Sequence, residues 1–186
     1  MRIIGGQYKG RSIKTCEGPG YRPATMKVRE SIFSMLMARG VDFDEVRVVD
    51  MFAGSGSLAI ECLSRGAREA WFVEKSNKAA GLIRKNLADL GVDKKRIRVV
   101  SKDLFGVLSK KPEVPFDLVF IDPPYGKDLL VPALEKALKN EWIAPGAIVL
   151  AEVETAVSAP TEGPIADMEL LTDREYGQTR ILLWRN

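Results

Sequence analysis

The stretch that most constrains the fold of this chain is a run of fifteen residues at positions 47–61. It begins with an apolar, β-branched segment that ends at Asp50, as expected of a strand buried on both faces. The pattern Gly54-x-Gly56-x-x-Ala59 follows this segment. Residues 57–65 then have the spacing of a helix. This pattern is typical of turns that bring the backbone close to a ligand at a helix N-terminus, so it predicts a nucleoside site rather than an ordinary glycine turn.

From residue 46 onward, strand-like and helix-like segments alternate. We expect strands over 46–50, 70–74, 97–100, 116–121 and 147–153, with helices over 57–65, 77–90, 104–109 and 129–139. This alternation predicts a parallel sheet with right-handed crossovers and helices on both faces. The last two segments, 168–175 and 179–184, leave no room for a helix between them and predict an antiparallel hairpin. The predicted fold is therefore α/β and Rossmann-like, with a seven-stranded, mostly parallel sheet.

The chain before this alternation is basic. Residues 1–14 alternate loosely around glycines and predict a short β-hairpin, and Thr25 is expected to cap a helix that runs to about residue 39. Residues 1–29 hold seven basic residues and one acidic residue, a net charge of +6, whereas the rest of the chain has a net charge of −3. Such asymmetry favours a polyanionic partner over a merely solvated edge. Lys27 and Arg29 are expected on or near the surface of the helix. The candidate contacts are Arg2, Lys9, Arg11, Lys14, Arg22, Lys27 and Arg29.

Several classes of protein are excluded by composition. The chain has no histidine, which removes histidine-based catalytic triads, general bases and metal sites. Cys16 and Cys62 fit no metal or redox spacing, so we expect reduced thiols, no metal and a cytoplasmic location. The N-terminus has no signal-peptide hydrophobic core, and no apolar run is long enough to cross a bilayer. We therefore expect no membrane partner.

Four acidic residues stand at the carboxyl ends of the first four predicted strands. They are Asp50, Glu74, Asp103 and Asp122. Ligands of parallel sheets bind at this edge, where Asp50 could accept a ligand ammonium and Glu74 both ribose hydroxyls. Asp103 could accept an adenine amino group. The set suits a cofactor with an amino-acid end and an adenosine end, and S-adenosylmethionine has both.

The sharpest chemical signal is the sequence Asp122-Pro123-Pro124-Tyr125, directly after an apolar strand. Two prolines fix the backbone there and remove two N–H donors. The Asp122 carboxylate and the Pro123 carbonyl then form an acceptor pair that suits the exocyclic amine of a nucleobase, on which Tyr125 can stack. A turn that is merely stiffened by proline is the structural alternative.

These motifs resemble those of a known family. Residues 49–58, Glu74 and residues 122–125 are similar to the motifs of class I S-adenosylmethionine-dependent amino methyltransferases. Further strings narrow the resemblance to the bacterial 16S ribosomal RNA guanine-N2 methyltransferase family, and they span nearly the whole chain. These strings are residues 2–11, Arg22-Pro23-x-Thr25, residues 28–33 and residues 176–179.

The resemblance implies a function and a set of residues. The reaction would transfer a methyl group from S-adenosylmethionine to the exocyclic N2 of one guanine in 16S rRNA, either free or within the assembling small ribosomal subunit. Residues 1–40 would form an RNA-contacting extension and residues 41–186 the methyltransferase domain of a monomer. The implied catalytic residues are Asp122, Pro123, Pro124 and Tyr125. The implied cofactor-binding residues are Asp50, Phe52, Ala53, Gly54, Ser55, Gly56, Glu74, Lys75, Asp103, Leu104 and Asp122.

Three other functions remain open at this point. A DNA adenine-N6 methyltransferase would use the same four-residue motif, but it usually needs a larger target-recognition insertion. A nicotinamide oxidoreductase could use the glycine turn and Glu74, but it would leave residues 122–125 unexplained. A catalytically idle RNA-binding module would retain the basic extension without a working cofactor pocket.

Overall fold

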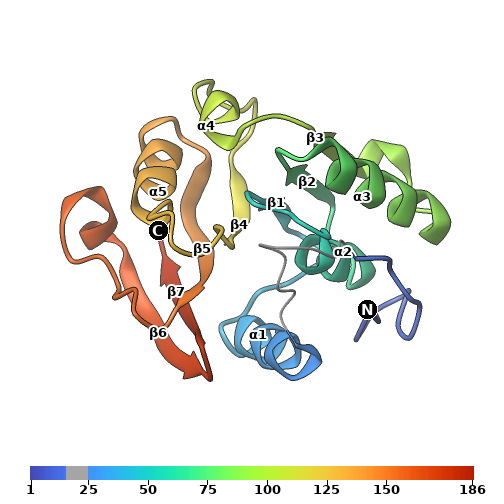
Figure 1. Cartoon of the computed structure of the whole chain (residues 1–186), viewed down its shortest axis with the longest axis horizontal. Coiled ribbons are helices and arrows are strands. Elements are labelled where there is room, and N and C mark those ends of the chain that lie inside the picture. The colour runs from blue at the N-terminus through green and yellow to red at the C-terminus, as the bar shows by residue number, and fades with distance from the viewer. Residues whose placement is uncertain (16–24) are drawn as a thin grey trace.

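The computed structural model describes residues 1–15 and 25–186 (Figure 1). Cys16 and Arg22 lie outside these residues. Part of the family-specific N-terminal pattern, which includes Arg22, therefore also lies outside them. The helices are α1 (Met26–Ala38), α2 (Ser57–Ser64), α3 (Asn77–Leu90), α4 (Leu104–Val107) and α5 (Leu130–Lys139), with 3-10 turns η1 (Lys94–Arg96) and η2 (Gly163–Asp167). The strands are β1 (Arg47–Asp50), β2 (Glu69–Val73), β3 (Ile97–Val100), β4 (Phe116–Ile121), β5 (Ile143–Glu154), β6 (Glu169–Tyr176) and β7 (Thr179–Arg185).

The strands form one seven-stranded sheet in the order β3-β2-β1-β4-β5-β7-β6. The first five strands in this order are parallel, and β7 runs antiparallel to both β5 and β6. The predicted α/β fold with an antiparallel C-terminal hairpin is confirmed. The chain order reverses between β1 and β4, and Asp50 lies in register with Phe72 of β2 and Phe120 of β4. The carboxyl ends of these strands therefore meet at one edge, next to the switch point where ligands of such sheets bind.

Helices cover both faces of the sheet (Figure 1). The apolar core on one face includes residues of α1, α2 and α3, and the core on the other face includes residues of α4, α5 and η2. The side chains of strand β5 alternate between these two cores. Ile148 and Leu150 join the first core, whereas Val149, Ala151 and Val153 join the second. Because strand side chains alternate, the intervening Glu152 faces the side of α1 and α2.

One predicted surface residue is in fact buried. Arg29 is 1% exposed because it occupies the same helical stripe of α1 as Ile32, Phe33 and Leu36, which faces the sheet. Its Nη2 donates to the carbonyl of Arg2 over 2.8 Å, and burial lowers the pKa of its guanidinium. The expectation that Arg29 lies on or near the surface and contacts RNA is therefore wrong.

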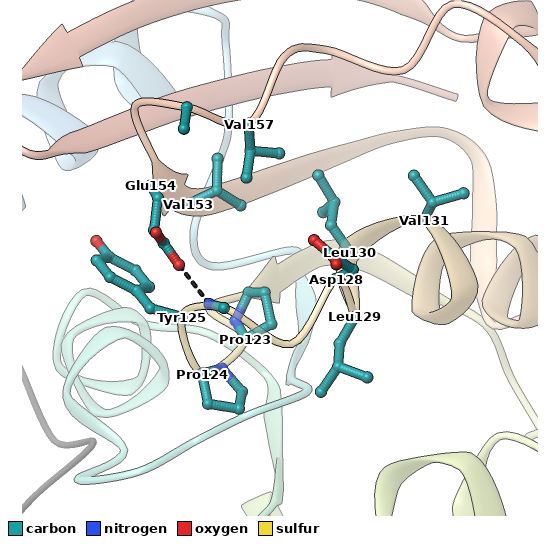
Figure 2. A pocket seen from close by; sticks show the side chains of 12 residues that line it. Pro123, Pro124, Tyr125, Asp128, Leu129, Leu130, Val131, Val153, Glu154 and Val157 are labelled. Carbon is teal, nitrogen blue, oxygen red and sulfur yellow. Dashed lines mark hydrogen bonds between the residues drawn. The ribbon is translucent and has the colours of Figure 1, made fainter.

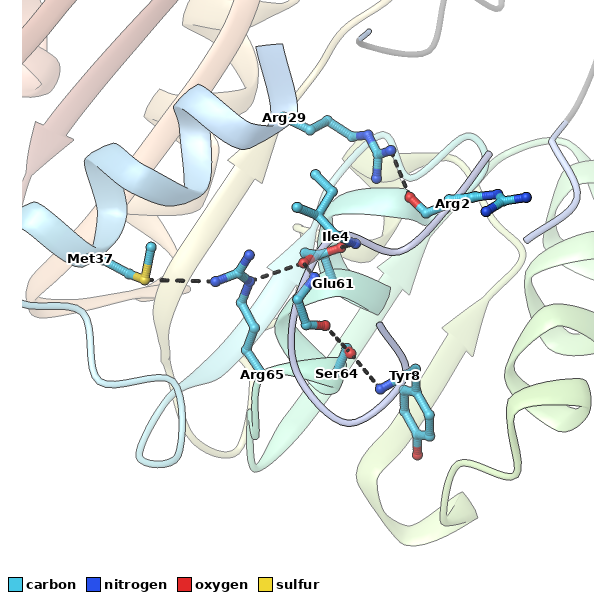
Figure 3. A network of polar contacts seen from close by, with 9 residues as sticks. Arg2, Ile4, Tyr8, Arg29, Met37, Glu61, Ser64 and Arg65 are labelled. Carbon is cyan, nitrogen blue, oxygen red and sulfur yellow. Dashed lines mark hydrogen bonds and ion pairs between the residues drawn. The ribbon is translucent and has the colours of Figure 1, made fainter. Parts of the chain in front are cut away.

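The N-terminal segment is docked on α2 (Figure 3). The predicted short hairpin is present as an antiparallel bridge between Arg2 and Ser12, flanked by backbone hydrogen bonds that join Met1 to Ile13 and Ile3 to Arg11. Glu61, which is fully buried on α2, accepts the backbone N–H groups of Ile4 at 2.8 Å and Gly5 at 2.7 Å. Arg65 Nε donates to the same carboxylate over 3.0 Å. A buried charge is therefore satisfied by backbone donors that lie far from it in sequence.

Close approach to α2 also explains a glycine in this segment. Gly6 has φ of +73°, and a Cβ built there would lie 1.8 Å from the carbonyl oxygen of Ser64. That carbonyl accepts the backbone N–H of Gln7 over 2.6 Å. Ile3 and Ile13 on either side join the core formed by α1, α2 and α3. The N-terminal segment is thus packed into the body of the protein.

The predicted start of β5 is too late. Its register with β4 shifts from Phe116 opposite Ile143 to Leu118 opposite Ile148, so the bulge falls between these pairs. The expected Pro145-Gly146 turn is this irregularity within a longer strand, rather than a break before it. Among the described residues, no helix is long and apolar enough to cross a membrane.

Replacing Glu61 by alanine should destabilise the fold. The backbone N–H groups of Ile4 and Gly5 would lose a charged acceptor, and we expect a loss of about 3 kcal/mol in the free energy of unfolding. Denaturant unfolding monitored by circular dichroism would measure it. The exposed Glu45→Ala is the control and should change little. Equal stability of the two variants would contradict the anchoring role of Glu61.

Candidate active site

The glycine turn between β1 and α2 is fixed from two directions. Gly54 and Gly56 have φ of +53° and +72°, a region that favours glycine. A Cβ at Gly56 would also lie 3.1 Å from the Phe72 ring and 3.2 Å from Ile83, so this glycine is required by packing. The backbone N–H of Gly54 donates to Oε2 of Glu74 over 2.8 Å. The structure thus brings Glu74 to the turn, as the sequence predicted.

Glu74 is a partly exposed acceptor with spare capacity. Its Oε1 accepts the backbone N–H of Ser76 over 2.6 Å, so each carboxylate oxygen holds one backbone donor. A carboxylate has about four lone-pair sites. Glu74 can therefore order the glycine turn and still accept ribose hydroxyls.

The remaining residues of the expected cofactor site range from exposed to buried. Asp103 caps α4 by accepting the N–H of Phe105 over 3.0 Å, and it is exposed. Lys75 Nζ lies 3.8 Å from the Asp103 carboxylate, and this lysine is also exposed. Ala53, Ser55 and Leu104 are buried, and Phe52 is half-buried.

Buried carboxylates gather where β1 and β4 end. Asp50 is 2% exposed, and its pKa is raised to about 7 by burial first and then by the charge of Glu74. The pKa of Asp122 is raised well above its usual value by burial, followed by the charges of Glu152 and Asp50. Asp122 keeps some solvent exposure. The structure therefore brings together Asp50 and Asp122, which the sequence assigned to the cofactor and the target amine.

Glu152 is the residue of this site that sequence reasoning missed. It lies near the end of β5, is 4% exposed, and has a pKa raised to about 7 by burial. Among the residues that the structure describes, its Oε2 has no hydrogen-bond partner. Its position in the strand did not single it out, because the acid at the carboxyl end of β5 is Glu154; the pairing of Ile121 with Ala151 is what brings Glu152 to the site.

The Asp-Pro-Pro-Tyr loop is held by the neighbouring strands. Tyr125 is 37% exposed, and its hydroxyl lies 3.1 Å from Oγ1 of Thr179 at the start of β7. Figure 2 shows Glu154, at the end of β5, accepting the backbone N–H of Gly126. Pro123 is buried and Pro124 is exposed. The tyrosine ring is thus positioned at the surface, where a base could stack on it.

A pocket of about 340 Å³ lies beside this loop (Figure 2). Its lining includes Pro123, Tyr125, Leu130, Val153 and Glu154. Val153 belongs to the core on the α5 side of the sheet, whereas Glu152 faces the opposite side. The pocket is therefore mostly apolar and reaches the core on the α5 side through Val153, with Glu154 at its polar edge.

The predicted RNA contacts have different environments. Arg2, Lys9, Lys14 and Lys27 are exposed, as expected. Arg11 is also exposed, but its guanidinium donates to the carbonyls of Asp89 at 2.6 Å and Leu90 at 3.5 Å, which lie at the end of α3. Arg11 therefore has a structural role, because it joins the N-terminal segment to the end of α3.

Comparison with known proteins identifies the family. The family model described as "Conserved hypothetical protein 95" matches residues 1–185. Ribosomal RNA small subunit methyltransferase D of Escherichia coli K12 is 35% identical over 185 residues, covering 100% of this chain and 89% of that protein. The protein of the same name in Haemophilus influenzae is 32% identical over 187 residues, covering 100% of this chain and 94% of the other. The chain belongs to this family.

Solved structures agree with this membership. The Escherichia coli protein yhhF, provisionally described as a methyltransferase, has a TM-score of 0.85 and 33% identity, covering 100% of this chain and 97% of the other. The protein TTHA0928 of Thermus thermophilus has a TM-score of 0.77 and 27% identity, with 98% of each chain covered. The class I methyltransferase fold and the family resemblance found in the sequence are both confirmed.

Replacing Glu152 by glutamine should stabilise the ligand-free protein at high pH. A carboxyl group whose pKa is raised from about 4.5 to about 7 keeps its proton in the folded state while the unfolded chain loses it. Wild-type stability therefore falls as pH rises through this window and stays lowered above it. We expect the variant to gain about 1–3 kcal/mol at pH 8 and little at pH 5, measured by denaturant unfolding.

The acids that face Glu152 also have raised pKa values, so a matched control is needed. Asp50 and Asp122 remain in the variant, and their pKa values should fall once the nearby charge is removed. Glu113→Gln changes an exposed acid just before β4, at the opposite end of the sheet. A Glu152→Gln profile that runs parallel to that of Glu113→Gln would contradict the raised pKa.

Proposed function

We propose that this protein methylates the exocyclic N2 of one guanine in 16S rRNA, with S-adenosylmethionine as the cofactor. The observation that carries the proposal is the placement of Asp122 beside Asp50 at the edge of the sheet, with Tyr125 exposed on the same loop, in a chain whose relatives are named small subunit rRNA methyltransferases. We further propose a monomeric, cytoplasmic enzyme whose basic N-terminal segment contacts the RNA.

The donor set of the site fits S-adenosylmethionine. Asp50 is a desolvated acid whose ionised form a cationic ligand would favour. Glu74 can receive ribose hydroxyls at the glycine turn, and Asp103 with Leu104 stands where the adenine would lie. Gly54 and Gly56 leave the turn free of side chains. Each end of the cofactor thus has residues of suitable chemistry.

The chemistry of the transfer consists mainly of positioning. When bound, S-adenosylmethionine supplies a methyl group that its sulfonium charge activates. As the guanine N2 lone pair forms the N–C bond, the S–C bond breaks and its electron pair stays on sulfur, leaving a neutral thioether. Asp122 and the Pro123 carbonyl hold the amine, Tyr125 stacks on the base, and the surplus proton passes to Asp122. Positioning of this kind can lower the barrier by about 7–11 kcal/mol.

Methyl transfer to defined nucleic acids tests this function. Tritiated S-adenosylmethionine would be incubated with unmodified 16S rRNA transcript, with small subunits assembled from that transcript, and with duplex DNA. We expect label in RNA, recovered as N2-methylguanosine after nuclease digestion and mass spectrometry. Label in DNA as N6-methyladenine would support the alternative enzyme, and binding of RNA without transfer would support the idle module.

Glu74→Ala should weaken cofactor binding. The change removes a charged acceptor for two ribose hydroxyls and also releases the N–H of Gly54, with each such bond contributing about 1.5–3 kcal/mol. Isothermal titration calorimetry with S-adenosylhomocysteine would measure the loss. Glu113→Ala, far from the glycine turn, should bind as tightly as the wild type. Unchanged affinity of Glu74→Ala would exclude Glu74 from the site.

Asp122→Ala should abolish methyl transfer while most cofactor affinity remains. Its main partner in the proposed reaction is the target amine, so the loss should appear in the rate of transfer under single-turnover conditions. Calorimetry with S-adenosylhomocysteine would show that the cofactor site persists. A single-turnover rate close to that of the wild type would eliminate this mechanism.

Replacing Lys9 and Lys14 together by alanine should weaken RNA binding and flatten its salt dependence. Both side chains are exposed on the docked N-terminal segment, and Arg11 is spared because it contacts α3. Two lost phosphate contacts should reduce the slope of log K against log salt by roughly 1.4. The matched control is Lys110→Ala with Lys139→Ala, also exposed. Isotherms of both variants that overlay the wild type across a salt series would place RNA elsewhere.

A further inference from the structure

Glu152 has a buried acceptor that nothing in the proposed transfer step uses. Within the described ranges, its Oε2 accepts no hydrogen bond, and the residue is 4% exposed. Leaving such an atom unsatisfied is unfavourable, and native proteins rarely leave these groups unpaired without a reason. The atom therefore marks a place where a donor is expected.

The strand register places this acceptor next to Asp122. Ile121 of β4 pairs with Ala151 of β5, so the residues that follow them, Asp122 and Glu152, stand side by side on adjacent strands. Such strands lie about 4.8 Å apart, a span comparable with the Watson–Crick edge of one base. Ile121 and Ala151 both belong to the core on the α5 side, so alternation along each strand turns Asp122 and Glu152 to the same, opposite side of the sheet. A base whose amine is held by Asp122 therefore presents its adjoining ring atom toward β5.

Bases with exocyclic amines differ in what they offer at that position. Guanine carries an N1–H donor beside its N2 amine, whereas adenine and cytosine carry an unprotonated ring nitrogen beside theirs. Above its raised pKa of about 7 Glu152 is ionised, and an ionised carboxylate accepts hydrogen bonds and donates none. Facing guanine, it gains a bond; facing adenine or cytosine, it opposes a second acceptor. A site built around a hydrogen bond rejects ligands that lack the matching group far more strongly than a shape-based pocket does.

We propose that Glu152 selects guanine, with its free carboxylate oxygen accepting the N1–H of the target base while Asp122 and the Pro123 carbonyl hold the N2 amine. This assignment rests on the proposed function. Glu152 determines which base binds, and it takes no part in the bonds that form and break during methyl transfer. The two carboxylates thus divide the edge of one base between them.

The test compares two target bases in two enzymes. The methylated guanine would first be mapped in 16S rRNA by mass spectrometry. RNA fragments would then be prepared with either guanine or 2-aminopurine at that position. 2-Aminopurine keeps the N2 amine but has an unprotonated N1. Glu152→Gln is nearly isosteric, and its amide can donate to that N1, whereas Glu113→Gln is the matched control.

We expect the wild type and Glu113→Gln to methylate the guanine RNA about 10–100-fold faster than the 2-aminopurine RNA in single turnover. In Glu152→Gln this preference should collapse to within about threefold, because the guanine rate falls and the 2-aminopurine rate rises. A readout independent of transfer is the fluorescence of 2-aminopurine in complexes with S-adenosylhomocysteine. Glu152→Gln should bind this RNA more tightly than the wild type does.

The outcomes separate the proposals. If Glu152→Gln slows both substrates by the same factor, the residue is a structural or proton-sharing partner of Asp122, and guanine selection by Glu152 is overturned. If the wild type labels no guanine in 16S rRNA, the proposed function fails, and the assignment that rests on it fails too. If the preference is unchanged in Glu152→Gln while guanine is methylated normally, the proposed function stands and the role of Glu152 is overturned.

Discussion

The rest of the structure is arranged around the burial of carboxylates at one edge of the sheet. Parallel strands end at the same edge, so Asp50, Asp122 and Glu152 are brought together with little water to screen them. Their raised pKa values show that the folded chain resists ionising all of them. The folded protein without ligands thus holds a set of acceptors poised for a cation and for amine donors, at a cost in stability that the two apolar cores offset.

A second buried carboxylate shows the opposite case. Glu61 is as deeply buried as Glu152, yet its oxygens accept two backbone N–H groups and the Arg65 guanidinium. Both acids end up inside the protein, but one is satisfied by the chain itself and the other is not. Burial alone therefore does not separate structural from functional acids in this fold. The presence or absence of internal donors does, and it assigns Glu61 to stability and Glu152 to a ligand.

Much of this could be predicted from sequence because it depends on local patterns. The alternation of strands and helices gave the correct sheet, and the glycine turn, Glu74 and residues 122–125 lie where their spacing placed them. Arg29 was misplaced because net charge does not indicate which basic side chain turns inward. Its helical spacing to Ile32 and Phe33 does indicate a buried position. Glu152 was missed because its role depends on pairing between β4 and β5, which no single stretch of sequence contains.

The docking of the N-terminal segment has a consequence for synthesis. The backbone of Lys14 is held by Asn86, 72 residues later in the chain, and Ile4 by Glu61, 57 residues later. At roughly 5–20 residues per second, these residues wait about 3–14 s for the helices that receive them. Ile3 and Ile13 stay exposed throughout that interval. The N-terminal segment can therefore reach its place only after α3 has emerged from the ribosome, although β3 to β7 are still to be made at that point.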